Sequence, residues 1–173
     1  MVEFRTIKGT HDLLPETLKF WKTIQFEITN IMEQYGYDEI RTPTFENTEL
    51  FIRGIGTETD IVNKEMYSWV DQAGDTLTLK PELTAPIARA YVQNQLGNKH
   101  PLHRLYYFDT LFRRERPQKG RYRQFHQFGV EVFGSEFPEI DVEVISLAIS
   151  IFNILELDGI NLKLNSIGSK DCR

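Results

Sequence analysis

Cysteine, long hydrophobic runs and secretion signals are scarce or missing in this 173-residue chain, and each absence excludes a class of protein. The single cysteine, Cys172, cannot form an internal disulfide and has no Cys or His partner at metal-ligand spacing. The most apolar stretch, residues 144–157, is interrupted by serine, asparagine and glutamate, and residues 1–16 contain no apolar segment typical of a signal peptide. We therefore expect a cytoplasmic protein with no membrane partner.

The chain also lacks internal repeats, low-complexity segments and Ser/Gly-rich linkers. Its 40% hydrophobic and 26% charged residues are those of an ordinary globular protein, so a single domain spanning residues 1–173 is predicted. No serine or cysteine stands in a nucleophile motif. Four histidines show no metal-ligand spacing (His11, His100, His103, His126). We expect neither covalent catalysis by the protein nor a protein-bound metal.

Acidic residues outnumber basic ones by 25 to 20, for a net charge of −5, yet basic residues are concentrated between residues 113 and 123. This stretch contains one acid, Glu115, and six cations (Arg113, Arg114, Arg116, Lys119, Arg121, Arg123). Neighbouring cations repel one another, so the cluster predicts either a bound anion, most simply phosphate, or ion pairs with nearby acids. Glu136, Glu139 and Asp141 are the candidates for the second alternative.

Hydrophobic periodicity predicts the main elements. An amphipathic helix should run from Pro15 to Tyr35 and end at Gly36, and a second should begin near Leu83 with Thr84 as its N-cap. Residues 37–45 and 162–164 are predicted as strands, and residues 66–80 as a β-hairpin. The helix from Pro138 to Leu157 is apolar almost all round and should be buried against a sheet.

Two longer strands, residues 102–114 and 124–133, flank the basic loop and alternate between two faces. On the second strand His126, Phe128, Val130 and Val132 should face the core, whereas Phe125, Gln127, Gly129 and Glu131 should form a pocket floor. The missing side chain of Gly129 would leave room for a ligand there.

The residue types around this floor point to nucleotide and cation recognition. Arginines bind phosphate oxygens in pairs of hydrogen bonds, and Phe125 offers a ring for a purine to stack on, unless it is simply a core residue. The Glu131 carboxylate must either bind a cationic ligand, such as an amine or imidazole, or pair with Arg113 or Arg123. Glu82 and Thr84 are otherwise ordinary capping residues.

The segment from Lys8 to Ser169 closely resembles the histidyl-tRNA synthetases, a family of class II aminoacyl-tRNA synthetases. KGTHDLLP (residues 8–15) is similar to their N-terminal signature, and YGYDEIRTPTFE (35–46) to class II motif 1, the homodimer element. FRRERPQKGRYRQFHQFGVEVFG (112–134) resembles motif 2 of the family over its whole length, which is far more specific than a short pattern.

The resemblance implies an α+β fold, with an antiparallel sheet flanked by helices, and ligation of histidine to its tRNA through histidyl-adenylate made from ATP. Histidine, ATP with magnesium, tRNA and a second copy of the chain would be the partners. Arg113 would be catalytic at the α-phosphate. The resemblance assigns ATP to Arg113, Glu115, Arg121, Arg123 and Phe125, and histidine to Glu82, Thr84, Gln127 and Glu131.

Two departures from the family pattern qualify this expectation. The family usually has glycine where Leu83 stands, so a side chain would occupy a position where backbone normally approaches the ligand. A larger residue there is also seen in the regulatory subunit of ATP phosphoribosyltransferase, a histidine-sensing paralogue that is the alternative function. The chain also ends before motif 3 and the anticodon-binding domain, so we expect a fragment of the catalytic domain that is inactive alone.

Overall fold

The computed structural model describes residues 3–55, 65–116 and 118–165, which form helices and two three-stranded sheets. Cys172 and the end of the predicted resemblance, up to Ser169, lie outside the described residues. In the main sheet the strand order is β1 (Asp38–Glu39), β5 (His103–Phe112) and β6 (Gln124–Phe133). β5 and β6 pair antiparallel along ten residues each, as their alternation predicts, whereas β1 lies parallel to β5.

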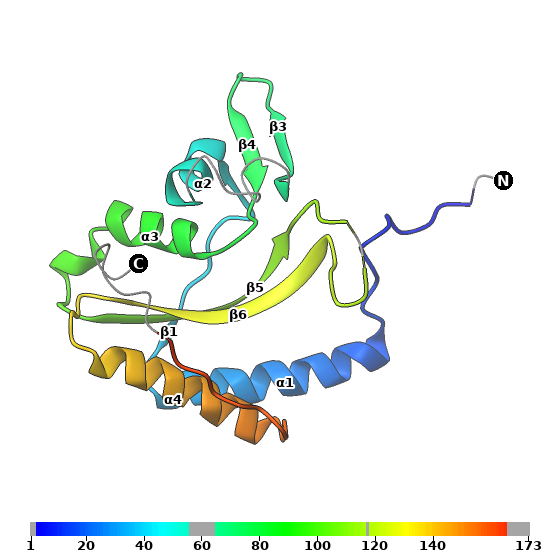
Figure 1. The fold of residues 1–173 in the computed structure, drawn as a ribbon. Coiled ribbons are helices and arrows are strands. Elements are labelled where there is room, and N and C mark those ends of the chain that lie inside the picture. The colour runs from blue at the N-terminus through cyan, green and yellow to red at the C-terminus, as the bar shows by residue number, and fades with distance from the viewer. Residues whose placement is uncertain (1–2, 56–64, 117, 166–173) are drawn as a thin grey trace.

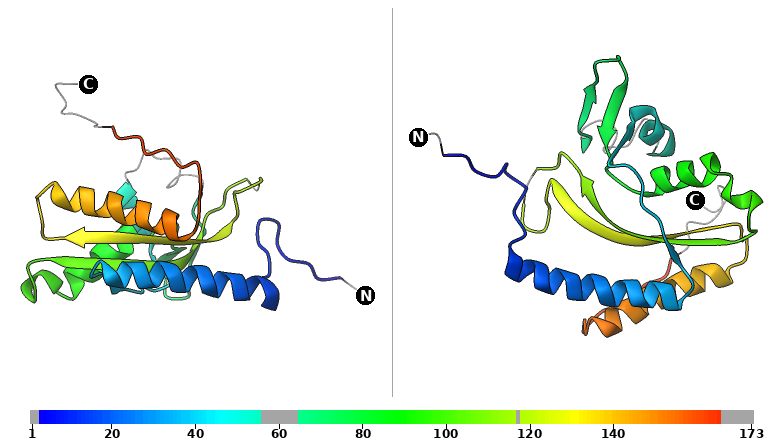
Figure 2. Two further views of the ribbon diagram at one scale, coloured as in Figure 1. Left: turned by 90° about the horizontal axis from the view of Figure 1, so that it is seen from below. Right: turned by 180° about the vertical axis from the view of Figure 1, so that it is seen from behind.

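Two helices cover one face of this sheet (Figures 1 and 2). α1 (Pro15–Gln34) and α4 (Glu139–Ile154) pack through a buried cluster that includes Ile28, Met32, Leu147 and Ile151. Phe128, Val130 and Val132 of β6 pack against that cluster, which confirms the predicted core face. α1 ends as predicted, because Gly36 takes a φ of +78° that most side chains disfavour.

The opposite face carries α3 (Thr84–Gln93), with the short η2 (Leu96–Asn98) after it. Its core consists of Leu83, Ile87, Leu105, Tyr107 and Leu111. This is the face of β6 on which the sequence places the pocket floor, so α3 and its preceding residues form one wall of any site there.

The second sheet stands beyond α3, in the order β2 (Phe45–Asn47), β4 (Thr76–Leu79) and β3 (Ser68–Val70), beside α2 (Thr48–Ile55). The predicted hairpin is confirmed: β3 and β4 pair antiparallel, and the Asp71 carboxylate accepts the N–H groups of Ala73 and Asp75 in the turn. Within the described residues, no helix is both long and apolar enough to cross a membrane.

Three of the predicted elements differ from the structure. Residues 37–45 are not one strand, because the chain leaves β1 after Glu39 and crosses to the second sheet before β2 begins. Residues 162–164 form no strand; Leu162 and Leu164 are exposed, and no neighbouring strand pairs with them in the part of the chain described, so their backbone has no ladder to join. α4 buries only one stripe, leaving Val142 and Ile149 exposed.

The start of α3 also differs from prediction. Thr84 is the first helical residue rather than the N-cap, a position that Leu83 occupies without a side-chain hydrogen bond. The carboxylate of Glu82 takes over the capping role, accepting the N–H of Ala85 at 3.1 and 3.2 Å. The Thr84 hydroxyl is therefore free to bond elsewhere.

Candidate functional site

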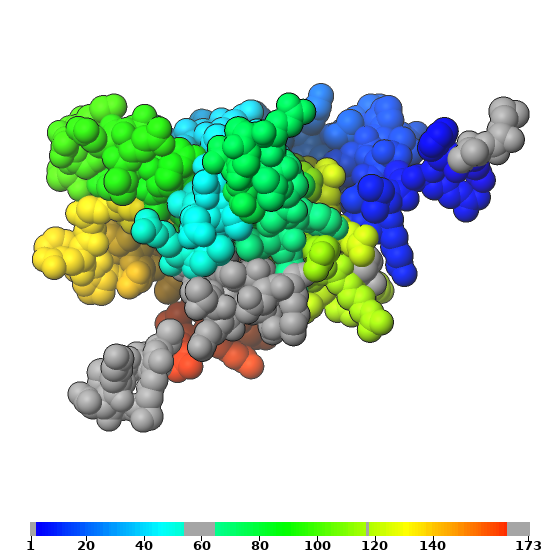
Figure 3. Space-filling view, turned by 90° about the horizontal axis from the view of Figure 1, so that it is seen from above, coloured from blue at the N-terminus to red at the C-terminus, as the bar shows by residue number. Residues whose placement is uncertain are grey.

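The basic loop is a closed extension of the β5–β6 hairpin. The N–H of Arg113 donates to the carbonyl of Arg123 at 3.0 Å, and Gln118 and Arg121 form a further bridge around Gly120, whose φ is +80°. The N–H of Arg123 donates to the carbonyl of Gly9 at 2.7 Å, so the loop is fastened to the N-terminal segment, which lies beside it in Figure 3. These backbone bonds place the cations on a supported frame.

A pocket of about 570 Å³ opens between the loop and β6. It is lined by Glu65, Arg113, Glu115, Gly120, Arg121, Tyr122, Phe125 and His126. Four of the five residues assigned to ATP therefore lie around one space. The fifth, Arg123, does not line it; its Nε donates to the Glu115 carbonyl at 3.4 Å.

Glu115 is the centre of charge in this pocket. Its carboxylate lies 3.9 Å from Nη1 of Arg113 and 3.4 Å from Nη1 of Arg121. The guanidinium of Arg113 also lies 5.2 Å above the Phe125 ring and donates its Nε to the carbonyl of Pro81 at 2.9 Å. Arg113 is thus held on one edge, which leaves its terminal nitrogens for a phosphate.

The alternative in which the loop cations pair with acids near α4 is not seen. Across residues 3–55, 65–116 and 118–165, the ion pairs of the loop arginines go to Glu115, and none joins them to Glu136, Glu139 or Asp141.

A second group of polar side chains continues the floor along β6. The Thr84 hydroxyl donates to Oε1 of Glu131 at 2.7 Å, and Nε2 of Gln127 donates to the Tyr107 hydroxyl at 3.2 Å. No arginine lies within ion-pair distance of Glu131 in the described chain, so the alternative pairing with Arg113 or Arg123 is not seen. The Glu131 carboxylate keeps acceptor capacity for a ligand.

Burial raises the pKa of both carboxylates in this group. For Glu131, desolvation raises the pKa and outweighs the opposite effect of the hydrogen bond from Thr84. For Glu82 desolvation again dominates; the backbone bonds from Ala85 and Thr84 and the charge of Arg113 lower the pKa, and the charge of Glu131 raises it. Two partly buried carboxylates close enough to repel each other favour a cationic ligand between them.

Gly129 has a different role from the one expected. A methyl group at this position would lie 2.6 Å from Cζ of Tyr107 and still closer to its hydroxyl oxygen. Tyr107 sits directly opposite Gly129 across the β5–β6 ladder and fills the space with its ring end. The glycine therefore makes room for Tyr107, which in turn supports Gln127, and does not leave a vacant place for a ligand.

Leu83 does not intrude into the site either. Its backbone has φ −117° and ψ −19°, which any residue adopts, and its side chain is only 1% exposed, packed with Ile87 and Leu111 in the core. The expectation that this side chain would stand between backbone and ligand is wrong, because the side chain points into the core between α3 and β5.

The two groups meet at Pro81–Glu82. The Pro81 carbonyl accepts a hydrogen bond from Arg113, which lines the pocket of the basic loop. The charges of Arg113 and Glu131 both shift the pKa of the neighbouring Glu82. One face of the hairpin thus presents guanidinium groups next to carboxylates, an arrangement suited to a ligand pair that carries phosphate and ammonium groups side by side.

Comparison with known proteins decides the family. A family model described as histidyl-tRNA synthetase matches residues 9–169, nearly the whole chain. The chain belongs to the histidyl-tRNA synthetase family. Its relatives include the histidine–tRNA ligases of Solibacter usitatus, 50% identical over 98% of the chain, and of Desulfitobacterium hafniense, 52% identical over 96%. The chain spans only about 40% of the length of these relatives, 41% and 39% respectively.

Solved structures agree with this membership and with the α+β class II fold. Apo histidyl-tRNA synthetase of S. aureus superposes with a TM-score of 0.76 and 37% identity, over 90% of this chain and 36% of that one. A Bacillus halodurans protein described as ATP phosphoribosyltransferase regulatory subunit/histidyl-tRNA synthetase superposes with a TM-score of 0.76 and 34% identity, over 91% of this chain and 40% of that one. With ligases as the curated relatives and Leu83 packed in the core, the regulatory alternative is not favoured.

Sequence reasoning missed some residues that shape this family's site in the present chain. Tyr107, which orients Gln127, was placed only as one residue of an alternating strand; pairing the two strands in register would have set it opposite Gly129. Lys80, buried behind the Pro81–Glu82 turn, carries no local signal, because its acidic partner is 29 residues away.

Proposed function

We propose that the protein carrying this chain ligates histidine to its tRNA in two steps. The carboxylate of histidine attacks the α-phosphorus of ATP and pyrophosphate leaves; a terminal hydroxyl of the tRNA then attacks the carbonyl carbon and AMP leaves. The observation that carries the proposal is the continuity of the arginine pocket with the Glu82–Glu131 group on one face of the hairpin. It brings an anionic and a cationic substrate together.

ATP occupies the arginine pocket in this proposal. Arg113 binds the α-phosphate and stabilises charge that develops as the bond to the leaving group breaks, a role that suits a guanidinium already fixed by Pro81. Phe125 stacks on adenine beside Glu115, and Arg121 and Arg123 serve the outer phosphates or the tRNA end. Magnesium bound to ATP would supply further positive charge at the outer phosphates, beside Arg121 and Arg123.

Histidine binds beside the carboxylates of Glu82 and Glu131 in this proposal. Glu82, Thr84 and Gln127 hold its α-ammonium, and Glu131 accepts the N–H of the imidazole. Support comes from Gln127: because its Nε2 donates to Tyr107, its carbonyl oxygen is left to accept from an ammonium group. The bond between Thr84 and Glu131 links the two ends of the amino-acid site.

We further propose a homodimer formed through α1 and the strand that follows it, with this chain as the N-terminal portion of the catalytic core. Phe20 and Phe26 of α1 are 69% and 62% exposed, apolar surface of the kind that a partner subunit covers. Sedimentation of the full-length protein at micromolar concentration tests this: a strict monomer contradicts it.

Histidine-dependent exchange of pyrophosphate into ATP by the full-length protein tests the function. Exchange that requires histidine, followed by transfer to tRNA, is the expected result. Absence of exchange together with stimulation of an ATP phosphoribosyltransferase by histidine would support the regulatory alternative instead.

A further inference from the structure

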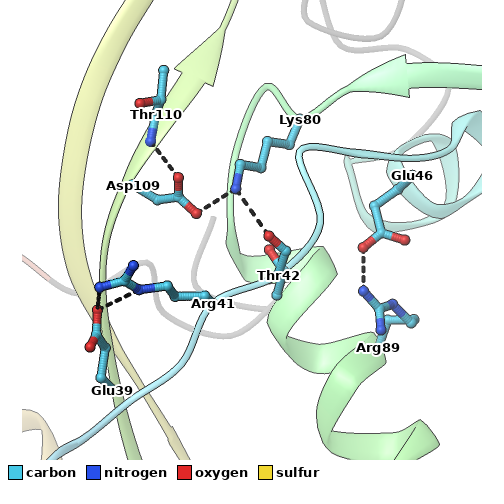
Figure 4. A network of polar contacts seen from close by, with 8 residues as sticks. All are labelled: Glu39, Arg41, Thr42, Glu46, Lys80, Arg89, Asp109 and Thr110. Atoms are coloured by element: carbon cyan, nitrogen blue, oxygen red, sulfur yellow. Dashed lines mark hydrogen bonds and ion pairs between the residues drawn. The ribbon is translucent and has the colours of Figure 1, made fainter.

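Lys80 is the most deeply buried cation for which the structure describes a side chain. It stands at the end of β4, is 1% exposed, and does not line the arginine pocket (Figure 4). An ammonium group removed from water is costly unless it is paired, so a buried lysine outside the substrate pocket requires an explanation.

The side chain of Lys80 is paired within the fold. Its Nζ forms an ion pair with Oδ2 of Asp109 on β5 and lies 3.4 Å from the carbonyl of Thr42. The other oxygen of Asp109 accepts the N–H of Thr110 at 2.7 Å, which fixes the carboxylate to its own strand. The ion pair therefore ties the end of β4 to the middle of the long hairpin, as Figure 4 shows.

The backbone of Lys80 makes two further connections, one to the segment before β2 and one to β5. Its N–H donates to the carbonyl of Thr44, and its carbonyl accepts the N–H of Phe112, both at 3.0 Å. Phe112 directly precedes Arg113, so the end of β5 is in register with the end of β4 through Lys80. Three segments distant in sequence converge on this one residue.

The residues that follow Lys80 are those of the proposed active site. The carbonyl of Pro81 accepts Nε of Arg113, and Glu82 accepts the N–H of Ala85 at the start of α3. A displacement of Lys80 relative to Asp109 would therefore shift the Pro81 carbonyl that orients Arg113 and, with it, the carboxylate of Glu82.

We propose that the partly buried Lys80–Asp109 ion pair is a positioning element for adenylate formation, which holds residues 81–84 at the distance from β5 that Arg113 and Glu82 require. The inference rests on the proposed function. It assigns no substrate contact to either residue: both act through Pro81 and Phe112 on Arg113.

The experiment separates positioning from mere stability by replacing the whole pair. Removing one partner, as in Lys80→Met, leaves the partly buried Asp109 carboxylate without its cation and destabilises the fold. The double variant Lys80→Met/Asp109→Leu removes both charges, and well-packed apolar replacements of buried ion pairs often keep or raise stability. Asp109→Asn is a second variant: it keeps the side-chain shape and an oxygen that accepts from Thr110 but removes the charge that compensates Lys80, so its stability is measured beside that of the double variant.

Two other ion pairs in the same view serve as controls (Figure 4). Arg41 pairs with Glu39 at the surface, so Arg41→Met removes a cation near the network without touching the turn. Arg89 of α3 pairs with Glu46 and is partly buried, so Arg89→Met lowers stability through a bond that does not involve Pro81 or Phe112. Both should retain the kcat of the parent protein.

Full-length variants are compared by thermal unfolding and by histidine-dependent pyrophosphate exchange. We expect the double variant and Asp109→Asn to remain folded while kcat falls on the order of 10- to 100-fold, as misplacement of a catalytic group does. The KM for ATP should change less than about twofold, because Phe125, Glu115 and Arg121 are held by the loop's own bonds.

The outcomes distinguish this inference from the proposed function. A parent protein that shows no histidine-dependent exchange refutes the proposed function itself. An active parent with a folded double variant, or a folded Asp109→Asn, that keeps its kcat overturns the positioning role. A fall in kcat matched by Arg89→Met at equal loss of stability also overturns it, since stability alone would then account for the effect.

Discussion

Gly129→Ala separates the two interpretations of the pocket floor. If the glycine leaves room for a ligand, the added methyl group affects histidine binding and spares the fold. If it leaves room for Tyr107, as the structure shows, the methyl group strikes a buried ring first. The new Cβ would lie 2.6 Å from Cζ and 3.1 Å from Cε2 of Tyr107, well inside van der Waals contact.

The magnitude follows from two opposing effects. Alanine in a strand is favoured over glycine by about 0.5–1 kcal/mol, because alanine loses less conformational entropy than glycine on folding. Overpacking a core position costs about 1–3 kcal/mol. Tyr107 is 5% exposed among Leu83, Ile87 and Leu111, so its ring has little space to withdraw into. We expect a net loss of about 1 kcal/mol of unfolding free energy, the difference between the middles of these two ranges.

A shift of Tyr107 also moves the hydroxyl that accepts from Gln127. Histidine KM should therefore rise together with the loss of stability. Urea unfolding and histidine-dependent exchange of the full-length protein measure the two effects. Gly97→Ala is the matched control, since its methyl group would likewise meet a tyrosine hydroxyl, that of Tyr91 at 2.6 Å, whereas Gln127 donates to Tyr107 and not to Tyr91. A Gly129→Ala protein as stable as its parent, with histidine binding lost, would refute the reasoning.

Three further substitutions test the charges. Arg113→Ala should lower the rate of pyrophosphate exchange by about 10² or more, with Arg113→Lys giving no rescue because a single ammonium cannot replace the fork; a near-normal rate speaks against the assignment. Glu131→Gln should raise the KM for histidine about tenfold or more. Because burial raises the pKa of Glu131, the substitution should also keep or increase stability at neutral pH, an advantage that disappears in acid. Denaturation across pH and separate KM values for the two substrates measure these effects, and an unchanged KM for histidine would contradict the specificity role. The Glu143 carboxylate accepts hydrogen bonds from Nε and Nη2 of Arg104 at 2.7 and 2.9 Å, which lower its pKa. Glu143→Gln should therefore reduce the free energy of unfolding by about 1–2 kcal/mol at neutral pH, and the difference should vanish as the pH falls through the pKa of Glu143 in the folded protein. Equal denaturation midpoints of parent and variant at pH 7 would contradict this prediction.

The carboxylates of the site illustrate a conflict between stability and binding. Glu82 and Glu131 both have raised pKa values because burial disfavours their charged form, so their ionisation at neutral pH works against folding. Within the described residues, the Thr84 hydroxyl offsets that cost for Glu131, and backbone N–H groups together with the charge of Arg113 offset it for Glu82. A cationic ligand would offset the remaining cost of burying the two ionised carboxylates. This explains why the carboxylates with raised pKa values lie at the proposed histidine site.

The sequence by itself determined the long elements and their faces. β5 and β6 follow from the alternation of two faces over ten residues each, and α1 follows from apolar residues at helical spacing up to Gly36. The same alternation placed Phe125, Gln127 and Glu131 together. Four of the five predicted ATP residues were found around one pocket because the motif 2 segment carries them on a single hairpin.

Tertiary structure decided what depends on partners distant in sequence. Nothing local distinguishes a glycine that admits a ligand from one that admits Tyr107, because the answer lies in the register of a neighbouring strand. Residues 162–164 have strand-like composition but no neighbour to pair with in the described chain. Lys80 reads as a surface lysine until the fold places Asp109 against it. Propensity and periodicity are properties of a segment, whereas hydrogen-bond ladders and buried ion pairs belong to two segments at once, and only the folded chain brings those together.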